Sequence, residues 1–224
     1  MQSYTFMVIT LVIACCNTPA QEATSPPDAT AANTVPALAE AADGAAWTLY
    51  ATVYTYVVPD DQNYAQPTVT FDRDWLHLEA RYNYENLETG SAWVGYNFSG
   101  GSKLEWEFTP MLGAVFGQLT GIAPGCELSL TWWKLTLYSE GEWVFDTGNS
   151  EDSFFYNWSE LSLSPVAWFR FGLVGQRTRA YATSVDIQRG LLMGFTHEPW
   201  DFNAYVLNLD EGEATWIFSL GVSF

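Results

Sequence analysis

The segment ATWIFSLGVSF, from Ala214 to Phe224, decides the fold of this chain. Most positions between its large apolar residues hold small or polar side chains. A period of two predicts a β-strand with one apolar and one polar face. A strand of about 9–11 residues is also what crosses a bilayer at a tilt in a closed barrel. The large apolar residues occupy every second position: Trp216, Phe218, Leu220, Val222 and Phe224.

The terminal Phe224 makes this segment resemble the closing strand of bacterial outer-membrane β-barrels. In those proteins the barrel-assembly machinery recognises the last aromatic residue. The resemblance implies an outer membrane of the Gram-negative type as the location. It also implies two partners, the outer-membrane lipids and the assembly machinery, with Phe224 as the recognition signal for the latter.

The composition agrees with a membrane barrel and excludes other classes. Aromatic residues make up 17% of the 224 residues, as interfacial girdles require. Charged residues make up 15%, below the roughly 25% of soluble domains. The only long apolar run lies at the N-terminus, so a helical membrane protein is excluded. The formal net charge of −18 excludes nucleic acid as a partner, because phosphate binding needs clustered Lys and Arg.

The first 45 residues are expected to lie outside the barrel domain, which spans 46–224. Residues 6–14 form a short apolar segment typical of a signal peptide, with cleavage expected after Ala20. The alternative is a lipobox that leaves Cys15 as a lipidated N-terminus. Residues 21–45 are rich in Ala, Thr and Pro and predict a disordered linker. Only Cys126 remains in the barrel domain, so no internal disulfide is expected there.

The remaining chain predicts an all-β, closed, antiparallel up-and-down transmembrane β-barrel. Eleven runs of alternation are clear, and the β-branched run QPTVTF at 66–71 supplies a twelfth. Twelve is favoured over the alternative of ten, since bacterial single-chain barrels have an even number of strands. The predicted strands are 46–58, 66–71, 75–84, 91–99, 103–116, 120–133, 134–146, 152–164, 166–178, 186–197, 200–209 and 214–224.

The lengths of the connections predict an orientation. Short turns in such barrels face the periplasm, and longer loops face the outside. Tight turns are expected at 72–74, 100–103, 133–134, 164–167 and 197–200, and both lysines, Lys103 and Lys134, lie there. The connections at the other end are longer and acidic. We therefore expect both lysines on the periplasmic side.

Ionisable residues on the polar faces are expected to line the lumen, because a charge facing lipid near the midplane costs about 2–4 kcal/mol. Two interpretations remain open. The residues interlock as an ion network that fills a closed structural barrel, which we favour, or their acidic excess lines a narrow cation-preferring, porin-like channel. The candidates are His77, Glu79, Arg81, Glu105, Glu107, Glu127, Glu140, Glu142, Glu160 and Arg170.

Basic residues are concentrated in one further group near the predicted extracellular rim: Arg177, Arg179 and Arg189. Strict alternation points them outward, towards anionic lipid headgroups. A β-bulge would instead turn them into the lumen.

Two alternative functions come from other classes. A lipid-modifying hydrolase of the outer membrane would use His77, with Ser91 on the neighbouring strand as a candidate partner. No hydrolase motif is recognisable, so an enzyme is not favoured. A secreted soluble barrel would show the same alternation with its apolar face inward, around a ligand. We expect no cofactor and no metal site.

Several segments resemble a family of uncharacterised bacterial outer-membrane-type β-barrel proteins. The resemblance covers most of the chain after Trp75 and implies fold and location only. It provides no activity, ligand or catalytic residues. The segments are LHLEARYNYE (76–85), GIAPG (121–125), YSEGEWVFD (138–146), FFYNWSE (154–160), QRTRAY (176–181) and DIQRG (186–190).

Overall fold

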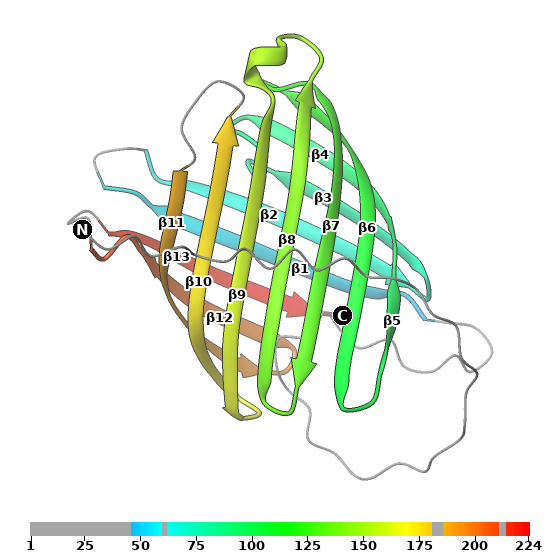
Figure 1. Cartoon of the computed structure of the whole chain (residues 1–224), viewed down its shortest axis with the longest axis vertical. Coiled ribbons are helices and arrows are strands. Elements are labelled where there is room, and N and C mark those ends of the chain that lie inside the picture. The colour runs from blue at the N-terminus through cyan, green and yellow to red at the C-terminus, as the bar shows by residue number, and fades with distance from the viewer. Residues whose placement is uncertain (1–45, 60–61, 181–185, 211–213) are drawn as a thin grey trace, which may run out of the picture.

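The alternation of apolar and polar residues forms strand segments along the whole barrel domain (Figure 1). The structure is a computed structural model that describes residues 46–59, 62–180, 186–210 and 214–224. The predicted signal peptide, its cleavage site, the linker and Cys15 lie outside the described residues. The strand segments are β1 (Thr48–Val57), β2 (Tyr64–Arg73), β3 (Leu76–Tyr82), β4 (Thr89–Tyr96), β5 (Phe98–Gly101), β6 (Leu104–Gly117), β7 (Gly121–Trp132), β8 (Leu135–Asp146), β9 (Phe154–Val166), β10 (Phe169–Ala180), β11 (Asp186–His197), β12 (Trp200–Leu207) and β13 (Thr215–Ser223).

These thirteen segments make twelve strands. Both β4 and β5 pair with β6, and one register continues through both, with Gly95 opposite Met111 and Phe98 opposite Phe108. The ladder is interrupted between these pairs, beside Pro110, which has no N–H to donate. The predicted count of twelve is therefore confirmed, and the alternative of ten is wrong.

The barrel closes between its first and last strands. Antiparallel pairing of β1 with β13 runs from Tyr50 opposite Ser223 to Val57 opposite Trp216. The backbones of Leu49 and Phe224 exchange two further hydrogen bonds, of 2.9 and 3.3 Å. Among the described strands, closure leaves no unpaired sheet edge, and a bilayer interior requires such closure.

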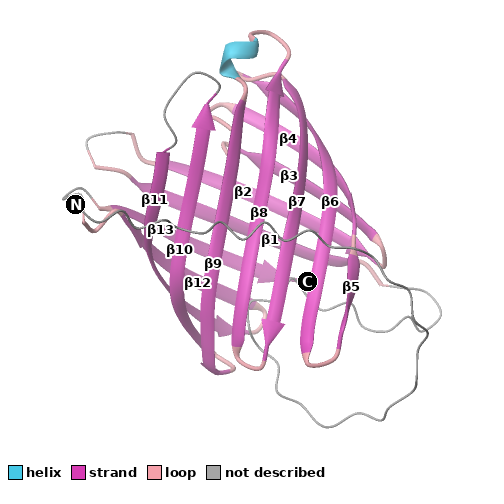
Figure 2. Cartoon of the chain, in the orientation of Figure 1, coloured by secondary structure: helices cyan, strands magenta, loops and turns pink. Residues whose placement is uncertain are grey.

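The two ends of the barrel differ in their connections. At one end, five turns of two residues each join β2–β3, β5–β6, β7–β8, β9–β10 and β11–β12. The connections at the other end are longer, from three residues at 118–120 to seven at 208–214. One of them carries the 3-10 helix η1 (Ser150–Asp152) (Figure 2). Among the described residues, no helix has the length and apolarity needed to cross a membrane.

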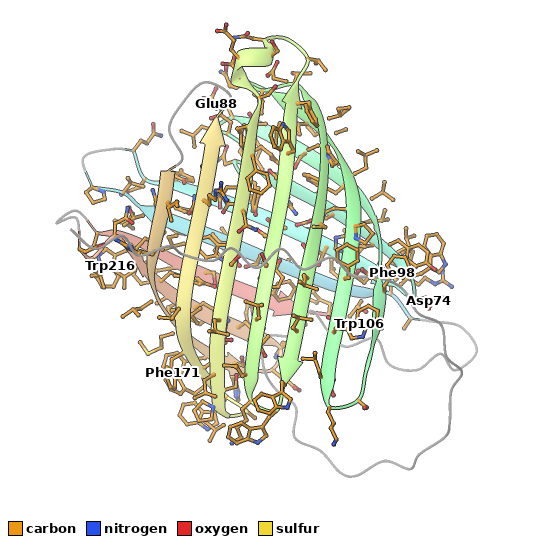
Figure 3. The ribbon with its side chains drawn as sticks, viewed as in Figure 1. Asp74, Glu88, Phe98, Trp106, Phe171 and Trp216 are labelled. Carbon is orange, nitrogen blue, oxygen red and sulfur yellow. The ribbon has the colours of Figure 1, made fainter. Side chains whose placement is uncertain are left out.

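The outer face of the barrel is apolar. On β13, Trp216 and Leu220 are each 46% exposed, whereas Ser219 between them is 2% exposed and points inward. Trp106, Phe171 and Trp216 project outward from three sides of the barrel in Figure 3. A soluble ligand-binding barrel places its apolar face inward instead. So extensive an exposed apolar surface is typical of contact with a membrane.

The inner face is not uniformly polar, which the alternation did not predict. Two apolar clusters lie inside the barrel, mostly towards the end with the longer connections. The first consists of Tyr56, Trp158, Val174, Leu192, Tyr205, Leu207 and Ile217. The second consists of Trp93, Met111, Val115, Leu119, Ala123 and Val144.

Candidate functional site: the lumen

One group of charged side chains, here named the His77 cluster, lies on the inner wall. Its anchor is β3, where the two-residue period directs His77, Glu79 and Arg81 to the same inward face. Arg81 Nη2 donates to Glu79 Oε2 at 2.8 Å, and Nη1 donates to Glu142 Oε2 at 3.0 Å. The members of the cluster are Asp72, His77, Glu79, Arg81, Glu127 and Glu142.

Asp72 corrects the prediction for the second strand. A turn was expected at 72–74, but β2 continues to Arg73 and brings Asp72 inward, where it is 4% exposed. Its Oδ1 lies 2.8 Å from His77 Nδ1 and also accepts a hydrogen bond from the Asn97 side chain. The carboxylate therefore fixes the orientation of the imidazole ring.

Two aromatic rings contact the Arg81 guanidinium. Its central carbon lies 4.3 Å from the ring centroid of Tyr84 and 4.7 Å from that of Trp93. Cation–π contact of this kind adds attraction at a desolvated site. With its two carboxylate partners, the cation is well compensated despite being buried.

The candidate hydrolase pair is not assembled. Ser91 donates to Glu85 Oε1 at 2.5 Å and accepts a hydrogen bond from Trp93 Nε1 at 2.9 Å. His77 contacts Asp72 and Glu79 instead. A nucleophile must lie within hydrogen-bond reach of its base, and Ser91 is not so placed beside His77.

A second group, the Arg170 cluster, lies on the wall formed by β9 to β13. Arg170 Nη1 donates to Glu160 Oε2 at 2.7 Å, while Nε and Nη2 both donate to Asn203 Oδ1. The Asn203 amide in turn donates to Ser219 at 3.0 Å. Sequence reasoning found Glu160 and Arg170 but missed Asn203, since an amide on an inward face gives no special signal.

A cavity of about 140 Å³ lies between the two clusters. Residues of both charged clusters line this cavity, together with tyrosines such as Tyr54, Tyr138 and Tyr156. Tyr138 donates to Glu140 at 2.7 Å. A second cavity of about 30 Å³ shares His77, Glu127 and Tyr138 with the first.

The remaining lumen candidates are spread along the barrel. Glu140 borders the larger cavity, and Glu107 borders the smaller one. Glu105 lies on the same face of β6 as Glu107 but is exposed beside the β5–β6 turn. The acidic lumen candidates therefore do not form one compact ring.

Two of the three rim arginines point outward, as strict alternation predicts. Arg177 and Arg189 are exposed on the outer face, and Arg189 pairs with Asp210 at 2.8 Å. The side chain of Arg179 lies outside what the structure describes. The Arg189 guanidinium lowers the pKa of the exposed Asp210 carboxyl through their hydrogen bond.

Taken together, the closed twelve-stranded antiparallel fold, the apolar outer face and the buried charged clusters define a β-barrel of the outer-membrane type. A solved structure described as "KdgM porin" matches with a TM-score of 0.59 and 10% identity, over 78% of this chain and 99% of that chain. Another, "KdgM porin in complex with disordered oligogalacturonate", matches with a TM-score of 0.55 and 10% identity, over 79% and 99%. At such identity the likeness concerns the fold alone. No family model and no curated protein sequence matches the chain.

Proposed function

We propose that this protein is an outer-membrane β-barrel that forms a narrow, cation-preferring passage. The location is supported by the porin-like fold, the apolar outer face and the terminal Phe224. We propose outer-membrane lipids as the surroundings of the apolar face and the assembly machinery as the partner of the last strand.

The charge of the larger cavity is the observation that carries the proposed preference. Five carboxylates line it, from Glu79, Glu127, Glu140, Glu160 and Asp201, whereas Arg170 is its one arginine or lysine. An acidic lining attracts cations and repels anions. Oligogalacturonate, the ligand of one neighbouring structure, is a chain of uronic acids and thus a polyanion. The passage proposed here disfavours such a ligand.

The test is conductance of the refolded protein in a planar bilayer, with reversal potentials measured in a salt gradient. Replacing Glu105 and Glu140 by Gln should weaken the cation preference. The matched control is Glu151→Gln in η1, which removes a charge from a loop and should leave selectivity unchanged. High salt screens the charges of the lining, so it should reduce the cation preference of every protein that shows one. Conductance without charge selectivity in the native protein would contradict the proposal.

A closed structural barrel is the second candidate. It is favoured by the two charged clusters and by the apolar clusters towards the end with the longer connections. In that case conductance is negligible for native and variant proteins alike. The same double replacement of Glu105 and Glu140 then lowers thermal stability only. Conductance and thermal unfolding measured on one sample therefore distinguish the two candidates.

A further inference from the structure

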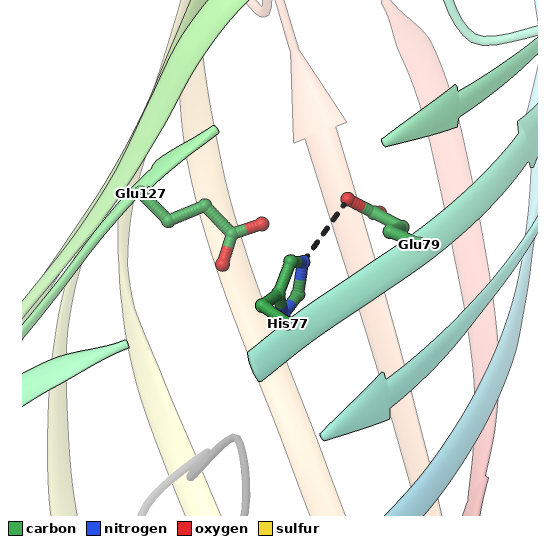
Figure 4. A group of neighbouring side chains, drawn as sticks. All are labelled: His77, Glu79 and Glu127. Carbon is green, nitrogen blue, oxygen red and sulfur yellow. Dashed lines mark ion pairs between the residues drawn. The ribbon is translucent and has the colours of Figure 1, made fainter. Parts of the chain in front are cut away.

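Three side chains of the His77 cluster point at one another from two strands. His77 and Glu79 come from β3, and Glu127 comes from β7 (Figure 4). One ligand atom of each, a ring nitrogen or a carboxylate oxygen, lies within 4.8 Å of the other two. One nitrogen and two oxygen donors in such a group are typical ligands of a metal ion.

The imidazole of His77 supplies a second and independent observation. Although His77 is 2% exposed, its Nε2 atom has no hydrogen-bond partner. The nearest Glu79 oxygen is 3.7 Å away, too far for a hydrogen bond. A buried polar atom without a partner is costly, and in a native protein it calls for a ligand or another explanation.

Asp72 orients the imidazole ring of His77 as in a metal-binding histidine. It lies 2.8 Å from Nδ1, the other ring nitrogen. When Nδ1 donates its proton to a carboxylate, Nε2 carries a free lone pair. Histidines that bind metals nearly always donate their second nitrogen to a carboxylate, carbonyl or water in this way.

We propose that His77 Nε2 and the carboxylates of Glu79 and Glu127 bind a divalent transition-metal ion, for which Zn²⁺ is the best match. This departs from the sequence, which gave no reason to expect a metal. Zinc accepts one His and two carboxylates and bonds at about 2.0–2.2 Å. The carboxylate of Glu127 must therefore move closer to the other two. Among the described residues, its one recorded ion pair is the long contact of 3.9 Å with Arg81, which restrains the carboxylate little.

The surrounding charges are compatible with a dication. Asp72, Glu79, Glu127 and Glu142 together carry four formal negative charges, against the single positive charge of Arg81. His77 and Glu127 also border both cavities, so water can complete the coordination. The site therefore lies on the inner wall, beside residues that line both cavities.

The test uses the full chain refolded in detergent micelles, with Zn²⁺ binding measured by calorimetry and Co²⁺ as an absorption probe of the ligands. We expect one ion per chain. His77→Gln should abolish both signals, and Asp72→Asn should weaken binding about 10–100-fold, as loss of the supporting carboxylate does elsewhere. Glu151→Gln in η1 is the control: it removes a carboxylate from a loop outside the lumen and should leave the affinity unchanged.

A loss of folding must be separated from a loss of ligand. Heat-modifiable gel mobility reports the folded barrel for each variant. Should His77→Gln fail to fold, Glu127→Gln decides, since the one ion pair recorded for Glu127 among the described residues is the 3.9 Å contact with Arg81. If either variant folds and still binds Zn²⁺ with the affinity of the native protein, the proposed site is overturned. Absence of Zn²⁺ binding to the native protein would overturn it as well, whatever the conductance measurements show.

Discussion

Arg81 on β3 donates a hydrogen bond of 3.0 Å to Glu142 on β8. In the sheet these two strands are separated by β4, β6 and β7, so the bond connects them through the interior of the barrel. The two residues are 61 positions apart in the sequence. Both are buried, at 6% and 4% exposure. The pair thus ties together one wall of the barrel from the inside.

Removing the Arg81 cation should destabilise the barrel strongly. Arg81→Met leaves Glu79 and Glu142 without compensation, which costs about 3–5 kcal/mol for a broken buried pair. Glu142→Gln should cost less, because Arg81 keeps its 2.8 Å bond to Glu79. Tryptophan fluorescence during urea unfolding measures both. Arg189→Met, which breaks an exposed pair, is the control and should change little. Native-like stability of Arg81→Met would contradict the role assigned to the cluster.

Gly113 should tolerate no side chain. A Cβ atom there would lie 2.6 Å from ring atoms of Trp93, so Gly113→Ala must displace the ring that stacks on Arg81. Overpacking of this kind costs about 1–3 kcal/mol. The matched control is Gly175→Ala, where a Cβ would meet only the Gln188 carbonyl oxygen at 3.9 Å. Equal unfolding midpoints for the two variants would contradict this account.

The side chain of Phe224 should matter for assembly rather than for stability. It is 73% exposed, and the hydrogen bonds to Leu49 come from the backbone. Phe224→Ala should therefore refold in detergent but accumulate poorly in the outer membrane. Phe218→Ala removes another exposed aromatic side chain from β13 and serves as control. Heat-modifiable mobility in membrane fractions measures both, and equal accumulation would refute the recognition of Phe224.

Cysteine labelling tests the orientation. We expect the end with longer connections to face the cell exterior. In a Cys126→Ala background, Cys introduced at Gly148, between β8 and β9, should react with an impermeant reagent on intact cells. Cys at Ser102, in the β5–β6 turn, should react only after lysis; the adjacent Gly101 is unsuitable, because its φ of 106° favours glycine. The reverse pattern would invert the topology.

The ion pair of Arg189 with Asp210 should respond to pH and salt. Because Arg189 lowers the pKa of Asp210 in the folded protein, the pair is present at neutral pH and is lost as the pH falls through that lowered pKa. Arg189→Gln should return the pKa of Asp210 to its ordinary range, and high salt should act in the same direction. A carboxyl NMR titration measures the change. Arg177→Gln is the control, and an equal effect from it would show that the contact is not specific.

The sequence by itself determined the class of fold and the direction of most side chains. The period of two at Trp216, Phe218 and Leu220 is a local property, so it identifies strands and their apolar face without any knowledge of the partners. The same pattern placed His77, Glu79 and Arg81 on one inward face. The break beside Pro110 and the extension of β2 through Asp72 to Arg73 were not apparent, because both depend on how a neighbouring strand pairs.

Only the tertiary structure decided which inward residues meet. Arg81 bonds to Glu142, and Ser91 to Glu85 rather than to His77. These choices depend on strand register and on the curvature that brings β3 near β8, both of which result from closing the whole barrel. The lack of a hydrogen-bond partner for His77 Nε2 likewise follows only from the tertiary structure. Alternation fixes the face on which a residue lies, whereas closure fixes the atoms that it contacts.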